Sequence, residues 1–375
     1  MRILVVGGGP AGLYFALLMK QRDPRHEITV VERDGPHDTF GWGIVFSDQT
    51  FSYLEDHDKP SADAIIAGCE TWNNVDVVHR GRKVTIRGNR FSGIARLAFL
   101  NILHHRCEAV GVDLRFHTNL TDPDQMTGCD LVVGADGANS FVRQIDRDAF
   151  QPSIDVRRNK YIWLGTRQLF HGLTLTFRRD EAGVFAAHSY KFSKTTSTFI
   201  VECPPETWAR AGFASMSEAD TSAYLERVFA DDLGGHPLLT NNFVRWLNFP
   251  LVKNVRWHHG DVVLLGDALH TAHFSIGSGT KLALEDAIAL AGAFDGADST
   301  SSALEAFERT RKPVVDRLQD AAYESLLRFE HMEDDMGLDP VAFAYRLMTR
   351  SGRIDREKLR KRDPEFVAAY ESESR

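Results

Sequence analysis

The stretch that decides the fold is RILVVGGGPAGLYFALLMKQRD, residues 2–23. It opens with a short apolar run, Ile3 to Val6, which is typical of a strand buried on both faces in a parallel sheet. Three glycines follow at the spacing G-x-G-x-x-G, namely Gly7, Gly9 and Gly12, and a helical pattern continues through Leu18. The stretch therefore predicts a strand, a tight turn and a helix in direct succession.

A second β-branched run completes the unit. It extends from Ile28 to Val31 and ends in Glu32, 20 residues after Gly12. This order predicts a βαβ site for a dinucleotide, in which Gly7 permits the turn, Gly9 lets the backbone approach a pyrophosphate and Gly12 allows close packing of helix and strand. Glu32 is expected to accept hydrogen bonds from ribose hydroxyls. A glycine-rich turn without a ligand is the alternative, and the motif alone does not separate NAD from FAD.

Two later apolar strands also run into glycine-rich turns that carry an acid. One lies in DLVVGADGANSFVR, residues 130–143, with Asp136, and the other in VVLLGDALH, residues 262–270, with Asp267. Because ligands of open α/β folds bind at the carboxyl ends of the strands, we expect all three turns to lie at one edge of the sheet. A simple nicotinamide dehydrogenase has no use for three such turns, whereas a long, bent cofactor is contacted from several loops. This favours FAD.

Composition and charge limit the classes of function. The 375 residues are 43% apolar and 26% charged, values typical of a soluble globular protein of about two domains. The net charge of −8 argues against a nucleic-acid partner. No apolar run approaches the ~20 residues of a membrane span, and the N-terminal run ends in glycines unlike a signal peptide, so we expect a cytoplasmic protein without a membrane partner. The scattered cysteines predict free thiols and no metal site; they are Cys69, Cys107, Cys129 and Cys203. The oligomeric state stays open.

The pattern changes between Gln151 and Arg256. There, KYIWLGTRQLF, LTLTFRRD, VFAAHSYKF and TSTFIVECP alternate β-branched and aromatic residues, as expected for an antiparallel sheet, and residues 71–88 have the same character. The fold class is therefore α/β, with a Rossmann-like FAD-binding domain interrupted by an antiparallel-sheet substrate domain and followed by C-terminal helices. The predicted boundaries are 1–71, 94–150 and 256–325 for the FAD-binding domain, 72–93 and 151–255 for the substrate domain, and 326–375 for the helical segment.

Three segments, in this order, resemble the single-component FAD-dependent aromatic hydroxylases of the para-hydroxybenzoate hydroxylase superfamily. They are GGGPAG with Glu32-Arg33, GADGANSFVR, and GDALHTAHFSIGSGTKLALEDA, and the resemblance covers essentially the whole chain. It implies that Asp136 lies near the pyrophosphate and is linked to both FAD and NAD(P)H binding, and that Asp267 contacts the ribityl chain. It also implies that Arg96, in GIARLAFLNIL, approaches the pyrophosphate from a helix, with a solvated helix arginine as the alternative.

The same resemblance places the glycines of the third segment beside the flavin ring. Backbone amides there, together with the N-terminus of a helix that is expected to start near Lys281, favour the negative charge that develops on the ring. The expected cofactor-binding residues are Gly7, Gly9, Pro10, Ala11, Gly12, Glu32, Arg33, Arg96, Asp136, Asp267, Gly277, Ser278, Gly279 and Thr280.

A narrower resemblance concerns the substrate. GWGIVFSDQTF, FSGIAR, WLGTRQLF, STFIVEC and HFSIG are similar to hydroxylases of aromatic CoA thioesters, and a tryptophan hydroxylase of violacein biosynthesis shares several of them. The resemblance implies that NADH or NADPH reduces FAD and that a C4a-hydroperoxyflavin hydroxylates salicylyl-CoA to gentisyl-CoA. 2-Aminobenzoyl-CoA and tryptophan or an indole stay open as substrates. A flavin-binding protein without turnover, or a dehydrogenase that uses no oxygen, is the alternative class.

Two histidines are candidate catalytic bases. His273 and Phe274 stand where the wider family has proline, close to the flavin, and His188 lies on the apolar strand AAHSYKF. A neutral imidazole accepts a phenol proton near neutral pH. A histidine that is simply part of the core is the alternative for both positions.

Aromatic and basic residues complete the set of candidates. Trp42, Phe46 and Phe274 are expected to wall an aromatic ring, with a plain core position as the alternative. The basic stretches 80–83 and 157–160 are candidate contacts for CoA phosphates, with a solvated basic face as the alternative.

Overall fold

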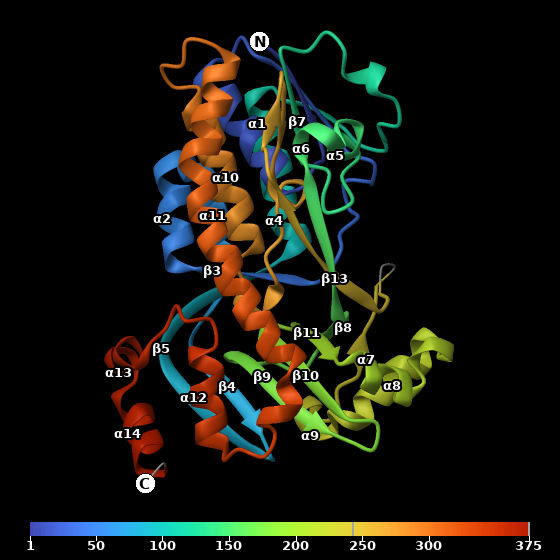
Figure 1. The fold of residues 1–375 in the computed structure, drawn as a ribbon, viewed down its shortest axis with the longest axis vertical. Coiled ribbons are helices and arrows are strands. Elements are labelled where there is room, and N and C mark those ends of the chain that lie inside the picture. The colour runs from blue at the N-terminus through green and yellow to red at the C-terminus, as the bar shows by residue number, and fades with distance from the viewer. Residues whose placement is uncertain (242–243, 374–375) are drawn as a thin grey trace.

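Two β-sheets lie one above the other along the long axis of the molecule, with helices on their faces (Figure 1). The computed structural model describes residues 1–241 and 244–373. The N-terminus lies at the end of the molecule that contains the first sheet, and the C-terminus lies at the opposite end.

The first sheet, counted over the described residues, has six strands in the order β14-β15-β7-β1-β2-β6. All neighbouring pairs are parallel except β14 and β15. Since β1, β7 and β15 are direct neighbours in this order, the three glycine-rich turns after them meet at one edge, as predicted. The strands are β1 Arg2–Val6, β2 Glu27–Val31, β6 Asp113–Arg115, β7 Leu131–Gly134, β14 His258–His259 and β15 Val262–Leu264.

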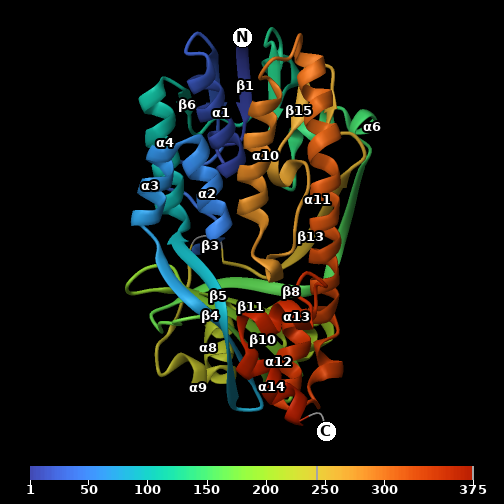
Figure 2. The ribbon, with the colours of Figure 1, turned by 90° about the vertical axis from the view of Figure 1, so that its left-hand side faces the viewer.

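Helix α1, Pro10–Arg22, is the central helix of this layer. Every residue from Ala11 to Met19 is buried, so α1 is apolar all round, as expected for a helix enclosed by other elements. It is packed by α4, Arg96–Val110, and by α10, Gly279–Ala293 (Figure 2). Proline at the first helical position fixes the backbone angle that a helix start requires. The smaller helices of this half are α2 Asp48–His57, α3 Lys59–Ala67, α5 Phe141–Ile145 and α6 Arg147–Phe150, with the 3₁₀ turn Pro123–Met126.

The second sheet, over the same described residues, has nine strands in the order β12-β8-β11-β10-β9-β4-β5-β3, with β13 also paired to β8. It is antiparallel as predicted, except that β4 runs parallel to β9, because the β4–β5 hairpin comes from a distant part of the chain. Strand β3 lies within the segment 1–71 yet pairs with β5. The domain boundaries themselves stay a prediction. The strands are β3 Gly43–Ser47, β4 Glu70–His79, β5 Arg82–Ala95, β8 Pro152–Thr166, β9 Leu173–Arg179, β10 Val184–Lys191, β11 Ser197–Cys203, β12 Leu238–Leu239 and β13 Leu247–Asn254.

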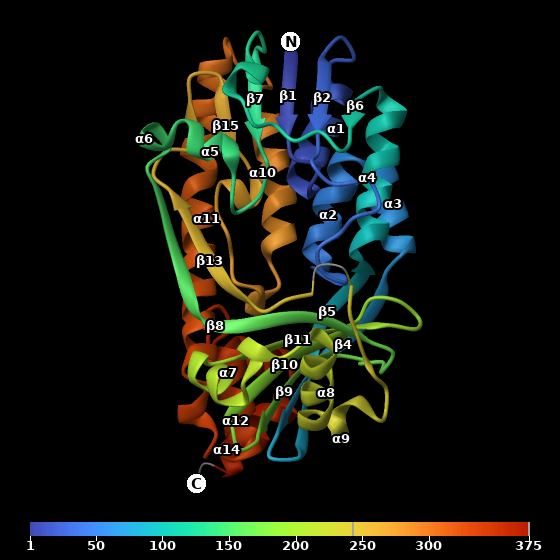
Figure 3. The same cartoon turned by 90° about the vertical axis from the view of Figure 1, so that its right-hand side faces the viewer.

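Strands β10 and β11 are buried on both faces of this sheet. Phe185, Phe199 and Val201 pack under the helices α7 Pro205–Ala211, α8 Glu218–Val228 and α9 Ala230–Leu233. The alternate positions of these strands, among them His188 and Glu202, lie on the opposite face, because side chains alternate along a strand. Long strands β8 and β13 continue as a ribbon along the side of the molecule toward the first sheet (Figure 3).

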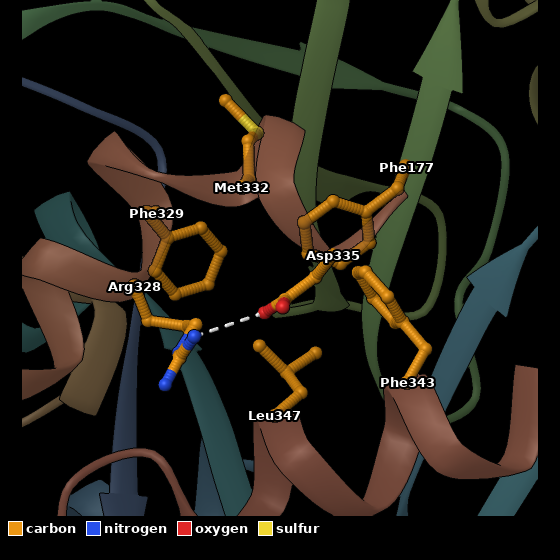
Figure 4. A pocket seen from close by; sticks show the side chains of 7 residues that line it. All are labelled: Phe177, Arg328, Phe329, Met332, Asp335, Phe343 and Leu347. Atoms are coloured by element: carbon orange, nitrogen blue, oxygen red, sulfur yellow. Dashed lines mark hydrogen bonds and ion pairs between the residues drawn. The ribbon is translucent and has the colours of Figure 1, made fainter. Parts of the chain in front are cut away.

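The 31-residue helix α11, Thr300–Glu330, runs from the first sheet down to the second (Figure 1). After the turn Met332–Asp335, helices α12 Pro340–Thr349, α13 Arg356–Arg362 and α14 Pro364–Glu373 cover the second sheet. A small cavity of about 10 Å³, room for roughly one water molecule, lies where α11, this turn and α12 meet β9 (Figure 4). Apolar side chains line it, together with the ion pair of Arg328 with Asp335.

Residues 1–241 and 244–373 contain no helix that combines the length and the apolar character a membrane crossing requires. The same residues hold no group of three or more His, Cys, Asp or Glu side chains placed to bind a metal ion. The four cysteines are free thiols, and burial raises the pKa of Cys107 to about 12.

Asp335 ties the C-terminal helices to α11, and its removal should loosen them. Its buried carboxylate pairs with Arg328 at 3.1 Å and with Arg346 at 2.8 Å. Asp335→Asn should therefore lower the free energy of unfolding by about 1–3 kcal/mol, the range for hydrogen bonds to charged groups. Urea unfolding followed by tryptophan fluorescence measures it. The exposed neighbour Asp334→Asn is the matched control, and an equal, negligible effect of both would contradict this role.

Candidate active site

Two glycines of the first turn are required by packing. Gly7 has φ +112°, and a Cβ there would lie 2.2 Å from the carbonyl oxygen of Ala135. A Cβ on Gly12 would lie 2.2 Å from the carbonyl oxygen of Gly7. Side chains are therefore excluded at both positions, and α1 approaches β1 and the turn after β7 more closely than any other residue type permits.

Gly9 differs from these two, because its side-chain direction is empty. Apart from its chain neighbours, no described heavy atom lies within 4 Å of the position a Cβ would take. Gly9 is the N-cap of α1, and no side chain hydrogen-bonds to the free amides of this helix start. Such amides, with the positive end of the helix dipole, form a ready anion site. The turn at Gly9, called the pyrophosphate cradle below, therefore offers both the space and the free donors that a pyrophosphate needs.

Glu32 holds the shape of the turn. Its Oε2 accepts a hydrogen bond from the amide of Gly8 at 2.7 Å, and its Oε1 accepts one from the amide of Asp34 at 3.0 Å. Each carboxylate oxygen keeps capacity for a further donor, so a ribose hydroxyl can still bind there. Arg33 is exposed, with Nε 3.4 Å from Asp34.

The third motif meets the first through small residues. Gly266 has φ +60°, and a Cβ there would lie 2.9 Å from the Cβ of Ala11 in α1. The next residue, Asp267, thus starts close to the pyrophosphate cradle. Burial raises the pKa of Asp267, and the charges of His270 and Arg96 oppose that rise. By solvent accessibility Asp267 is nevertheless exposed, so a ligand can reach its carboxylate.

Arg96 carries a buried donor without an acceptor. It is the first residue of α4, and within the described chain its Nε has no hydrogen-bond partner. Burial lowers its pKa, and the charges of Asp267 and Tyr190 oppose this. A buried guanidinium N–H is costly unless an anion pairs with it. The phosphates of FAD would supply that anion.

Asp136 has a structural task that the sequence does not reveal. Its Oδ2 accepts hydrogen bonds from the amides of Phe141 at 2.6 Å and Val142 at 3.2 Å, and so holds the start of α5. Its Oδ1 is buried and has no partner among the described residues. Backbone amides therefore engage Oδ2, whereas Oδ1 is enclosed and has no such partner.

The start of α10 offers a second set of free backbone amides. Gly277 has φ +59°, and a Cβ on Gly277 or Gly279 would meet no described atom within 4 Å beyond its chain neighbours. Ser278 is the N-cap, but its hydroxyl donates to the Ile276 carbonyl oxygen at 3.2 Å and leaves the helix amides free. Thr280 lies in the first turn. The helix begins two residues before Lys281, near the predicted position.

His273 and His188 lie on either side of a buried acid, Glu202. The distance from His273 Nε2 to Glu202 Oε2 is 3.8 Å, and that from His188 Nε2 to Glu202 Oε1 is 3.6 Å. The exposed fractions are 4% for each histidine and 1% for Glu202. The predicted pair of histidines thus comes together in the structure, with a carboxylate between them that the sequence analysis missed.

The geometry disfavours the predicted role of His273 as a base. Its Nδ1 accepts a hydrogen bond from the amide of Ser275 at 3.3 Å and lies 2.9 Å from the Ser275 hydroxyl. The proton of the neutral ring therefore sits on Nε2, which faces Glu202, and no lone pair is left for a substrate proton. Burial and the charges of His188, Arg350 and Arg157 hold the pKa of His273 well below its usual range. His273 is a neutral hydrogen-bond donor.

Aromatic rings surround His188. Its ring centroid lies 5.3 Å from that of Phe274 and 4.7 Å from that of Phe329, and Phe274 lies 5.0 Å from Tyr161. Burial and the charge of Asp267 raise the pKa of Tyr161 to about 12, so this cluster lies within electrostatic reach of the proposed ribityl contact.

The structure does not bring the other two aromatic candidates to this cluster. Phe46 is 1% exposed and packs in the first core against Phe51 and Phe99, which excludes it from a substrate wall. Trp42 packs on β8, where a Cβ at Gly165 would lie 2.8 Å from its ring. The Nε1 atom of Trp42 is buried and unpartnered within the described chain, so Trp42 keeps a free donor near Arg96, whose amide donates to the Trp42 carbonyl oxygen.

Two charged groups of the site escaped the sequence analysis. Glu202 is the acid in STFIVEC, and alternation places it on the same face as His188 of the neighbouring strand, a signal that strand register makes readable. Arg350, at the end of α12, donates to the Ser275 carbonyl oxygen at 2.6 Å and the Ser325 hydroxyl at 2.8 Å. Burial lowers its pKa to about 10, and Glu202 opposes that fall. No sequence pattern links Arg350 to the site.

A buried ionic chain supports the third motif from behind. His270 Nε2 lies 2.7 Å from Asp286, and Arg311 Nε lies 2.6 Å from the same carboxylate. Burial alone would raise the pKa of Asp286, but the charges of His270 and Arg311 outweigh it, and the pKa is lowered. These contacts of Asp286 with His270 and Arg311 thereby fix the turn after β15 to α10 and α11.

Comparison with known proteins agrees with this geometry. The family described as FAD binding domain matches residues 1–322. The chain belongs to this family. It is 42% identical to salicyloyl-CoA 5-hydroxylase of Streptomyces sp over 98% of its own length and 72% of that protein, and 36% identical to protodeoxyviolaceinate monooxygenase of Chromobacterium violaceum over 92% of each. The chain is an FAD-dependent aromatic monooxygenase.

Other members of the family extend the comparison. A 3-hydroxy-4-methyl-anthranilyl-[aryl-carrier protein] 5-monooxygenase of Streptosporangium sibiricum is 36% identical over 94% of this chain and 95% of its own. The fold resembles a crystal structure of 2-methyl-3-hydroxypyridine-5-carboxylic acid oxygenase, with a TM-score of 0.74 over 96% of this chain and 98% of that one, at 21% identity. The predicted fold class is confirmed.

Filling the cradle at Gly9 should weaken FAD binding. Gly9→Val places a branched side chain where the pyrophosphate is expected to pack, so affinity for FAD should fall roughly tenfold or more, about 1.4 kcal/mol. Gly337→Val is the matched control, because its Cβ also meets no described atom within 4 Å and its backbone does not require a positive φ. Flavin content of the purified variants measures the effect. Normal occupancy in Gly9→Val would remove the cofactor from this turn.

Arg96 should contribute to FAD affinity through its charge. Arg96→Gln removes the unpartnered guanidinium, and apoprotein titrated with FAD by flavin fluorescence should bind about 10- to 100-fold more weakly, the equivalent of a charged hydrogen bond. The exposed Arg90→Gln, on β5, serves as control. Equal affinities would show that Arg96 does not touch the phosphates.

Proposed function

We propose that this chain hydroxylates the ring of salicyloyl-CoA para to its hydroxyl, with FAD as cofactor and NADH or NADPH as reductant. The observation that carries the proposal is the 42% identity to salicyloyl-CoA 5-hydroxylase over 98% of the chain. This match extends beyond residues 1–322, the part of this chain that the FAD-binding family matches. It includes the second sheet and the helices that cover that sheet. The elements that would surround a substrate are therefore part of the similarity.

Electron balance requires the reductant. Insertion of one oxygen atom from dioxygen reduces the other to water, which consumes two electrons from NADH or NADPH and two protons overall. When bound, FAD accepts the hydride and activates dioxygen, chemistry that side chains cannot supply. The chain contributes the cradle at Gly9, the charge of Arg96 and the acid Asp267, which support a fixed position for the flavin.

The cluster around His188 supports an aromatic substrate. Phe274 lies in the turn just before α10 and contacts the rings of Tyr161 and His188. Aromatic rings at such spacing hold a flat ligand by offset or edge contacts. An apolar surround also keeps water from the reacting centre. The substrate ring is thus expected between Phe274 and the flavin.

The basic stretches do not support a CoA site. Arg157 pairs with Glu330 at 2.6 Å and with Asp155, and Arg158 pairs with Glu206 at 2.7 Å. Arg82 lies 3.7 Å from Glu373 at the far end of the β4–β5 hairpin. Acids of this chain already pair with these three arginines, so the arginines lend no support to a CoA site, and the support for the thioester comes from the relative.

A carrier protein in place of CoA is the second candidate. The relative from Streptosporangium sibiricum is named for an aryl group on an aryl-carrier protein, at 36% identity. In both cases the ring is the part that the site must recognise.

Parallel turnover assays test the proposal. Salicyloyl-CoA, salicyloyl-pantetheine, 2-aminobenzoyl-CoA, free salicylate and tryptophan are each supplied with FAD and either NADH or NADPH, and products are identified by mass. We expect salicyloyl-CoA to gain one oxygen atom and free salicylate to stay unchanged, because the acid lacks the thioester. Turnover of salicyloyl-pantetheine at an equal rate would favour the carrier-protein substrate. Oxidation of tryptophan, with both thioesters inert, would contradict the proposal.

A further inference from the structure

A buried carboxylate, Glu202, lies on the same face of β10 and β11 as His188 and lacks the hydrogen-bond partners that such a group needs. Glu202 is 1% exposed, and within the described chain neither of its oxygens accepts a hydrogen bond. An isolated buried carboxylate is strongly disfavoured unless charges or protons compensate it. Burial of the Glu202 carboxylate therefore lowers the free energy of unfolding.

Charged and polar groups face Glu202 from every element packed around it. His188 approaches from the neighbouring strand β10, and His273 approaches from the loop before α10. Arg350 acts from the end of α12, and burial leaves it with a pKa of about 10, so it is a cation at neutral pH. The ion pair of Arg157 with Glu330 lines a cavity of about 10 Å³ beside Glu202 and His273, which has room for roughly one water molecule.

These groups give the two histidines different roles. His273 is a neutral donor, because Ser275 occupies its Nδ1 and its Nε2 proton faces Glu202. His188 turns Nε2 toward the other oxygen of Glu202. Within the described chain, Nε2 is buried and has no hydrogen-bond partner, a combination that does not hold for Nδ1. A carboxylate accepts only, so the His188 proton belongs on Nε2 and the lone pair on Nδ1.

We propose that His188 takes the proton of the substrate hydroxyl on Nδ1, and that Glu202 is the positioning residue that holds the opposite nitrogen and balances the charge formed. In this step the phenol O–H bond breaks and an N–H bond forms, with no electron transfer. The resulting phenolate is the more electron-rich ring, and the imidazolium lies against Glu202. The step rests on the proposed function, since it needs a substrate with a phenolic hydroxyl.

Glu202→Gln tests the kinetic consequence. The change keeps the shape of the side chain and removes its charge, so hydroxylation of salicyloyl-CoA at pH 7 should slow roughly 100-fold, a typical contribution of general base catalysis. KM and the rate of flavin reduction should change less than about twofold, and NAD(P)H oxidation should instead release hydrogen peroxide. Raising the pH should restore the variant, because the phenol then ionises without a base. Glu206→Gln, an exposed acid paired with Arg158, is the matched control.

A second measurement does not need turnover. Histidine ring NMR of the FAD-loaded protein, assigned with His188→Gln, should show the proton of the His188 ring on Nε2, and the signal of that nitrogen should shift in Glu202→Gln but not in Glu206→Gln. An unchanged Nε2 signal, or an unchanged pH profile of hydroxylation, would overturn the proposal. If the wild type leaves salicyloyl-CoA unchanged while the Nε2 signal shifts as expected, the substrate assignment fails and the pairing of His188 with Glu202 stands.

Discussion

The close approach of α1 to the carboxyl edge of the first sheet is the constraint on which the rest of the structure depends. A side chain on Gly7 or Gly12 would lie 2.2 Å from a backbone oxygen, so this approach exists only because both are glycine. The approach gathers the turns after β1, β7 and β15 at one edge, and Gly266 then packs on Ala11. The start of α1 has no side-chain cap, and no described atom fills the side-chain direction of Gly9. The packing of α1 against the sheet therefore creates the expected anion site.

The last third of the chain returns to the second sheet and covers it with the C-terminal helices. Helix α11 leads from the first sheet to the second, and the helices after it bring Arg350 against Ser275 and Ser325. The loop before α10 and the C-terminal segment are thereby joined by hydrogen bonds. Glu202 lies near this junction, with His188 and His273 on either side and the charge of Arg350 within electrostatic reach.

Local patterns allowed much of the fold to be predicted. The apolar run before Gly7, the period-two strands of the middle segment and the acid after each glycine turn all depend on near neighbours in sequence. The prediction of Phe46 as a substrate wall rested on aromatic character, which does not distinguish such a wall from a core position, and the structure packs Phe46 in the core against Phe99. The prediction of His273 as a base could not take account of the amide of Ser275, which hydrogen-bonds to its Nδ1 and disfavours that role. Glu202 and Arg350 meet only through tertiary packing, which no spacing in the sequence encodes.

The central claim is that the flavin lies between the edge of the first sheet and the His188 face of the second. A crystal structure of the oxidised holoenzyme with salicyloyl-CoA tests it most directly. The account predicts pyrophosphate density at Gly9 and Arg96, a flavin ring between the start of α10 and Phe274, and the phenolic oxygen within hydrogen-bond reach, about 2.6–3.2 Å, of His188 Nδ1. Flavin density away from this junction, or a substrate ring distant from His188, would contradict it.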